Sequence, residues 1–101
     1  MAGKPIARIG DTWEGICYSH ESPISVTGEI ITGNSLCVVQ GKTIARDGDT
    51  VEASCGHTDT IIATSSVCTI QGDLVARVDD ETTGSTLEGK IIEGAPGVTS
   101  L

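Results

Sequence analysis

Two short segments of the chain place a cysteine close to a histidine. They are Cys17-x-x-His20 and Cys55-x-His57, and they contain the only two histidines of the sequence. Two thiolates and two imidazoles make up the tetrahedral ligand set that Zn²⁺ prefers at closed structural sites. We therefore predict a single metal site from these four residues, with zinc as the metal and iron as an ion that would accept similar ligands.

The same two pairs have other interpretations. A cysteine could be a nucleophile and its neighbouring histidine the base, either Cys17 with His20 or Cys55 with His57. The sequence shows no recognisable third catalytic group and no oxyanion loop, which argues against this small Cys/His enzyme. Alternatively, the histidines are surface residues with no relation to the cysteines.

The sequence that must form the elements positioning these pairs is repeated three times along the chain. Residues 35–50 recur at 66–81 without a gap, and the second half of that segment also occurs at 4–12. Such recurrence is typical of a chain built from one repeated unit. We predict a single domain with pseudo-threefold symmetry, whose three units are approximately residues 4–41, 42–72 and 73–101. A surface of this kind would match a partner made of three identical chains, although a linear stack of units is the alternative.

Every unit also carries an arginine three residues before an aspartate. The three pairs are Arg8 and Asp11, Arg46 and Asp49, and Arg77 and Asp80. This spacing suits a tight turn closed by a charge-assisted hydrogen bond, whereas solvated turn residues are the alternative. In the third unit Asp79 stands where the others have glycine, and aspartate tolerates a positive φ better than most residues.

The cysteines fall into two classes. Cys17 and Cys55 each lie six residues after the aspartate of their turn, so we expect both loops at the same end of the molecule. The third unit has Thr86 at that point and supplies no ligand there. Cys37 and Cys68 instead occupy equivalent positions in a repeated strand, where we interpret them as small buried residues, with a disulfide between them left open.

Composition predicts an all-β fold of short strands. About a third of the residues are Ile, Val or Thr, which favour strands, and 13 glycines interrupt them. The Ile-Ile pairs at 30–31, 61–62 and 91–92 each predict a strand, and a further short strand follows each of them. Residues 13–28 form an insertion that contains Trp13, and its polar, Gly- and Pro-punctuated composition predicts a loop.

The net charge of −8 argues against a nucleic-acid-binding protein, because six Lys and Arg residues cannot neutralise many phosphates. No apolar run approaches the length of a membrane span, and the first residues lack the apolar segment of a signal peptide. We expect synthesis in a reducing cytoplasm, which favours metal binding over disulfides, and export by another machine if the protein leaves its cell.

Three segments of the repeat resemble the Pro-Ala-Ala-Arg motif of the PAAR-repeat proteins. They are Pro5-Ile6-Ala7-Arg8 with Gly10-Asp11, Thr43-Ile44-Ala45-Arg46 with Gly48-Asp49, and Leu74-Val75-Ala76-Arg77 with Asp80. The resemblance implies a small β-rich cone with a zinc near its apex, held by His and Cys at Cys17, His20, Cys55 and His57. Family members often use three histidines and one cysteine, whereas these four positions offer two of each.

The resemblance also implies a function that is mechanical rather than enzymatic. Such proteins cap the trimeric β-helical spike of contractile phage tails and type VI secretion systems, with one tip on each trimer, and sharpen it for membrane piercing. The expected location is the virion, at the tip of the tail baseplate, or outside the cell after type VI export. Expected contacts are the spike, the target membrane transiently and recruited effectors. A free-standing zinc-binding structural or adaptor module is the alternative from another class.

Overall fold

The computed structural model describes residues 4–63, 69–70 and 72–100, which form strands, turns and loops without a helix. The predicted all-β fold is therefore confirmed. The strands are β1 (Lys4–Pro5), β2 (Thr12–Cys17), β3 (Ile24–Ile30), β4 (Asn34–Val39), β5 (Lys42–Ile44), β6 (Thr50–Ala53), β7 (Thr58–Ile62), β8 (Thr69–Ile70), β9 (Asp73–Leu74), β10 (Glu81–Thr82), β11 (Leu87–Ile91) and β12 (Thr99–Ser100).

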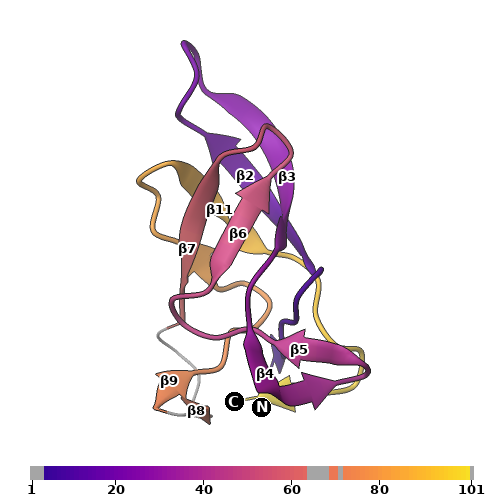
Figure 1. Cartoon of the computed structure of the whole chain (residues 1–101). Coiled ribbons are helices and arrows are strands. Elements are labelled where there is room, and N and C mark those ends of the chain that lie inside the picture. The colour runs from indigo at the N-terminus through magenta and orange to yellow at the C-terminus, as the bar shows by residue number, and fades with distance from the viewer. Residues whose placement is uncertain (1–3, 64–68, 71, 101) are drawn as a thin grey trace.

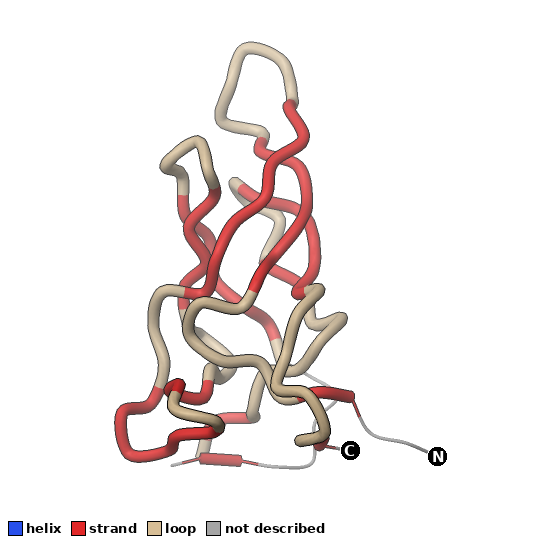
Figure 2. The backbone as a smooth tube through the Cα atoms, turned by 90° about the vertical axis from the view of Figure 1, so that its right-hand side faces the viewer, coloured by secondary structure: helices blue, strands red, loops and turns tan. Residues whose placement is uncertain are grey.

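The strands form a closed barrel that stands on three small ribbons. The antiparallel hairpins β2–β3, β6–β7 and β10–β11 close the barrel in the order β10-β11-β2-β3-β6-β7. The ribbons are β4–β5, β8–β9 and β1–β12, and the last of these joins the two ends of the chain. Figure 1 shows the ribbons at one end, which we call the base, and a taper towards the β2–β3 connection at the other end, the apex. Figure 2 shows the same taper from the side.

A ring of three backbone hydrogen bonds joins the repeats where the base meets the barrel. Ala7 N–H donates to the carbonyl of Ala76 at 2.9 Å, Ala76 N–H to Ala45 at 3.0 Å, and Ala45 N–H to Ala7 at 3.0 Å. All three alanines are fully buried. The repeats are therefore arranged around an axis rather than stacked in a line.

The Arg–Asp turns follow this ring directly, and their backbones are nearly identical. In each turn the arginine N–H donates to the aspartate carboxylate, at 2.7, 2.6 and 2.8 Å in chain order. The aspartate N–H donates back to the arginine carbonyl, at 3.0, 3.0 and 3.1 Å. The turn also requires a positive φ, which is 88° at Gly10, 90° at Gly48 and 77° at Asp79. Aspartate therefore takes the conformation that glycine takes in the other two units.

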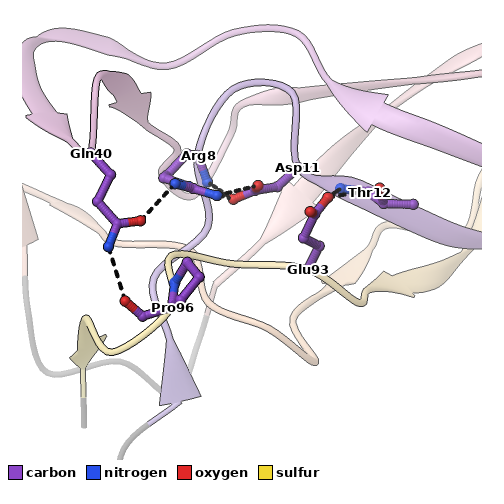
Figure 3. Close-up of polar contacts among 6 residues, drawn as sticks. All are labelled: Arg8, Asp11, Thr12, Gln40, Glu93 and Pro96. Atoms are coloured by element: carbon purple, nitrogen blue, oxygen red, sulfur yellow. Dashed lines mark hydrogen bonds and ion pairs between the residues drawn. The ribbon is translucent and has the colours of Figure 1, made fainter.

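The arginine and aspartate side chains of the first turn form more and shorter hydrogen bonds than those of the second turn. Asp11 accepts from both Arg8 Nε at 3.0 Å and Arg8 Nη2 at 2.9 Å, and both side chains are almost fully buried. This contact raises the pKa of Arg8. Arg8 Nη1 donates a hydrogen bond to the side-chain oxygen of Gln40, and the Gln40 amide nitrogen donates to the carbonyl of Pro96 (Figure 3). The Arg46–Asp49 pair is longer, at 3.7 Å, and more exposed.

Each Ile-Ile pair has one buried and one exposed member. Ile30, Ile61 and Ile91 are buried in the barrel, and each donates its N–H to the carbonyl of the turn aspartate. The following residues, Ile31, Ile62 and Ile92, face outward. The first members fill the core with the other buried side chains of the barrel, chiefly Trp13, Cys17, Val26, Val51 and Leu87.

The prediction of a loop over residues 13–28 was wrong. The segment forms most of the β2–β3 hairpin, with only residues 18–23 outside the strands, and Trp13 is fully buried. Gly15 and Gly89 are cross-strand partners, and an added Cβ on either would lie 2.7 Å from the Trp13 ring. These glycines make room for the indole, so the composition that suggested a loop belongs to a strand pair under a large side chain.

Other strand predictions have mixed outcomes. The short strand predicted after the first Ile-Ile pair, at residues 36–39, corresponds to β4. The one predicted after the second pair, at residues 67–70, lies partly outside the described residues, and Cys68 lies outside them. Cys37 is half-buried rather than buried, and it is a free thiol.

The two aspartates of the first and second turns provide a test of these contacts. Asp11→Asn removes the negative charge that pairs with the buried Arg8, so we expect a loss of about 3 kcal/mol in the free energy of unfolding. The matched variant Asp49→Asn should lose less, about 1 kcal/mol, because its arginine is more distant and more exposed than Arg8. Urea unfolding of the metal-free proteins measures both. Equal losses would contradict a special role for the first turn.

Candidate metal centre

The four predicted ligands meet at the apical end of the barrel. Cys17 ends β2 and His20 follows in the β2–β3 connection, whereas Cys55 and His57 lie in the turn between β6 and β7. One ligand atom from each residue lies within 4.8 Å of all the others. The structure therefore brings together all four residues that the sequence singled out.

The distances within this cluster suit a tetrahedral ion. His57 Nδ1 lies 3.4 Å from Cys17 Sγ and 3.4 Å from Cys55 Sγ. Zinc bound at its usual distances from sulfur and nitrogen would separate two such ligand atoms by about 3.5 Å. The His20 and His57 rings meet edge to face, with their centroids 5.0 Å apart.

One buried nitrogen of the cluster lacks a hydrogen bond. His20 Nε2 is inaccessible to solvent and has no hydrogen-bond partner in the part of the chain that the structure describes. An unsatisfied buried polar atom costs free energy, so such atoms call for an explanation. A metal ion bound among the four side chains would satisfy this nitrogen. The donor set and the orphaned atom both fit zinc.

The barrel holds the two cysteines in different ways. Cys17 is fully buried and pairs with Leu87 on one side and Ile24 on the other, within the antiparallel ladders. Cys55 is half-buried in a tight turn, in which Ala53 N–H donates to the carbonyl of His57 at 2.8 Å. A positive φ of 92° at Gly56 allows this turn. Cys17 is thus a fixed ligand, and Cys55 lies on a short, more accessible turn.

The electrostatic surroundings also differ for the two thiols. Burial raises the pKa of Cys17. The neighbouring His20 side chain, together with the backbone and ring of His57, lowers the pKa of Cys55 to about 6. Cys55 is therefore largely a thiolate at neutral pH, which is the form that binds metals.

A carboxylate of the second unit, Asp59 on β7, binds the third unit at the point where that unit has no metal ligand, and sequence reasoning missed it. Asp59 accepts hydrogen bonds from the N–H groups of Thr60, Thr86 and Leu87, at 2.7, 3.0 and 2.9 Å, and from the hydroxyl of Thr83. Burial alone would raise the pKa of Asp59, but these donors outweigh burial and lower it. Asp59 thus fastens the β10–β11 connection to β7. No motif revealed it, because three of its four donors are backbone N–H groups, and two of these belong to a distant segment.

The six arginine and aspartate residues of the repeated turns do not belong to this centre. They lie beside the alanine ring, between the base and the barrel. Their hydrogen bonds described above are formed within each turn and, for Arg8, with Gln40 of the base. They shape the fold that carries the cluster rather than contributing to it.

Comparison with known families identifies the repeat. The family model described as the PAAR motif matches residues 1–57 and 20–87. The chain belongs to the PAAR family. That family is known for structural spike tips, which points away from catalysis, and its metal binding is compatible with the Cys/His cluster. No curated protein gave a match. Among the described residues, no helix is long and apolar enough to cross a membrane.

Metal content tests the centre directly. We expect purified protein to contain one equivalent of zinc by elemental analysis, and Cys17→Ala or His57→Ala to lose it. Removal of the metal by a chelator should lower the Tm by about 10 °C or more, because an ion that binds only the folded chain stabilises it. Cys37→Ala, which changes a thiol outside the cluster, is the matched control. Full zinc content in both ligand variants would rule out this site.

Proposed function

We propose that this chain is the tip of a trimeric β-helical spike in a contractile injection machine, where it caps the spike and sharpens it for membrane piercing. Its membership of the PAAR family supports this function. The observation that carries the proposal is the ring of Ala7, Ala45 and Ala76, by which one chain acquires a threefold axis. A single tip can then offer similar surfaces to all three chains of a spike.

The base has the features needed for docking at the end of a β-helix. Its three ribbons are each only two strands wide within the described residues, so they leave strand edges open. Open edges can pair with the strands of a partner and extend its sheets. On β4, Val38 is 58% exposed, which adds apolar surface at this end of the cone. The base therefore suits a strand-rich partner.

The opposite end suits a mechanical role. The barrel narrows to the β2–β3 connection (Figures 1 and 2), and that connection contributes His20 to the Cys/His cluster. Zinc held by these four side chains would fasten the β2 end to the β6–β7 turn. Such a clasp contributes folding free energy to a small domain with a thin core, on the order of 10 kcal/mol in isolated zinc modules. The apex would then keep its shape under load.

In this proposal, load applied at the apex would pass towards the base through the Arg–Asp turns. Arg8 is bound to Asp11 in the first turn, to Gln40 in the β4–β5 ribbon, and through Gln40 to Pro96 near the end of the chain (Figure 3). This network connects distant parts of the chain where base and barrel meet. None of these roles requires catalysis, and we propose a non-enzymatic protein.

Several features of this proposal depend on the partner. One tip would bind each spike trimer, effectors could be recruited to the complex, and the target membrane would be touched only transiently. The machine would be a phage tail or a type VI secretion system, with the tip located in the virion or exported. The alternative, a free-standing zinc-binding adaptor, would have no threefold partner.

Binding to a trimeric spike tests the proposal. We expect native mass spectrometry to show one tip with three chains of a β-helical spike protein from a contractile machine. Val38→Asp should weaken this complex by about tenfold or more, because it places a charge in the apolar base. Ile24→Asp is the matched control, since Ile24 is also exposed but lies near the apex. Its complex should keep its affinity.

Two results would contradict the spike-tip function. One is the absence of any complex of three chains with one tip. The other is loss of binding in Ile24→Asp but not in Val38→Asp, which would move the docking surface to the apex.

A further inference from the structure

The metal cluster contains two thiols that are neighbours in space. Cys17 Sγ and Cys55 Sγ both contact His57 Nδ1 at 3.4 Å and lie within 4.8 Å of each other. Both are free thiols. Because they are 38 positions apart along the chain, a bond between them would join the hairpin of the first unit to that of the second.

From this geometry we propose that the apex has a second, covalent clasp: Cys17 and Cys55 form a disulfide when the metal is absent and a small-molecule or protein disulfide is present. This inference rests on the proposed metal site and concerns its regulation. The metal would connect the two hairpins in a reducing cytoplasm, and the disulfide would connect them in an oxidising compartment such as a bacterial periplasm.

The two cysteines differ in ways that set the order of the steps. Cys55 is half-buried on the β6–β7 turn and meets the oxidant first, whereas Cys17 is fully buried between two strands. The Cys55 thiolate attacks one sulfur of the oxidant and displaces the other as a thiolate. Cys17, after losing its proton, then attacks Cys55 Sγ and displaces the second thiolate. The two protein thiols lose two electrons and two protons, and one disulfide of the oxidant becomes two thiols.

The bond requires a modest movement of one partner. The sulfurs must approach from within 4.8 Å to about 2 Å. Cys17 is held by Leu87 and Ile24 in the ladders, so the turn that carries Cys55 supplies the displacement. Space is open beside this turn, because a Cβ added at Gly56 would have nothing within 4 Å of it.

Oxidation would also release the metal. A disulfide removes both thiolate ligands and leaves only His20 and His57, which is half of a tetrahedral set. The two clasps are therefore mutually exclusive, and the bound ion protects the thiols by occupying them. The cross-link would replace the ion as the connection between the two hairpins.

The test compares metal-free and zinc-loaded full-length protein, each treated with oxidised glutathione. Peptide mapping without reduction should find Cys17 linked to Cys55 in the metal-free sample. The zinc-loaded sample should form this link at least about tenfold more slowly, and a chromogenic chelator should detect one zinc released for each link formed. The doubly substituted control, Cys37→Ser with Cys68→Ser, should behave in the same way because it keeps both apical thiols.

Two outcomes would overturn the inference. They are a metal-free protein in which Cys55 stays glutathionylated while Cys17 remains a thiol, and one in which either residue pairs instead with Cys37 or Cys68. Because wild-type protein is mapped, the result does not depend on a variant that folds. A failure here would leave the binding of a trimeric spike untouched, so it can be told apart from failure of the spike-tip function.

Discussion

The ring of hydrogen bonds among Ala7, Ala45 and Ala76 is the constraint on which the rest of the structure depends. Each buried amide is satisfied by the carbonyl of another repeat, so no repeat completes its own hydrogen bonding. An unpaired buried N–H or C=O costs about 1–3 kcal/mol, which penalises the loss of any one member. The three repeats therefore form one cooperative unit.

The distance from this ring determines how symmetric the molecule is. Beside it, the three Arg–Asp turns have nearly the same backbone, and each binds an isoleucine N–H of the barrel. Towards the apex the hairpins differ in length, and the first is the longest. The connections also differ in kind, since Cys and His side chains link the first two units whereas Asp59 fastens the third. A threefold ring with its adjoining turns thus carries an asymmetric apex.

Much of this arrangement could be predicted from the sequence. The repeat revealed the turns, because a tight turn has local requirements at fixed positions. The Cys/His pairs revealed the cluster, because they occupy equivalent positions in the first two units and so lie at the same end of the molecule. The hairpin of residues 12–30 was missed because its glycines fit a loop equally well until the position of Trp13 is known. Asp59 was missed because its role depends on N–H groups that every sequence possesses.

Hydrogen exchange at the ring is the most direct test of the central claim that one chain forms a single threefold body. The amides of Ala7, Ala45 and Ala76 should exchange with the same free energy, equal to that of global unfolding, because none can open without breaking the ring. Exchange of the Ala76 amide at a markedly lower free energy than the other two would show that the third unit opens alone, and it would contradict this account.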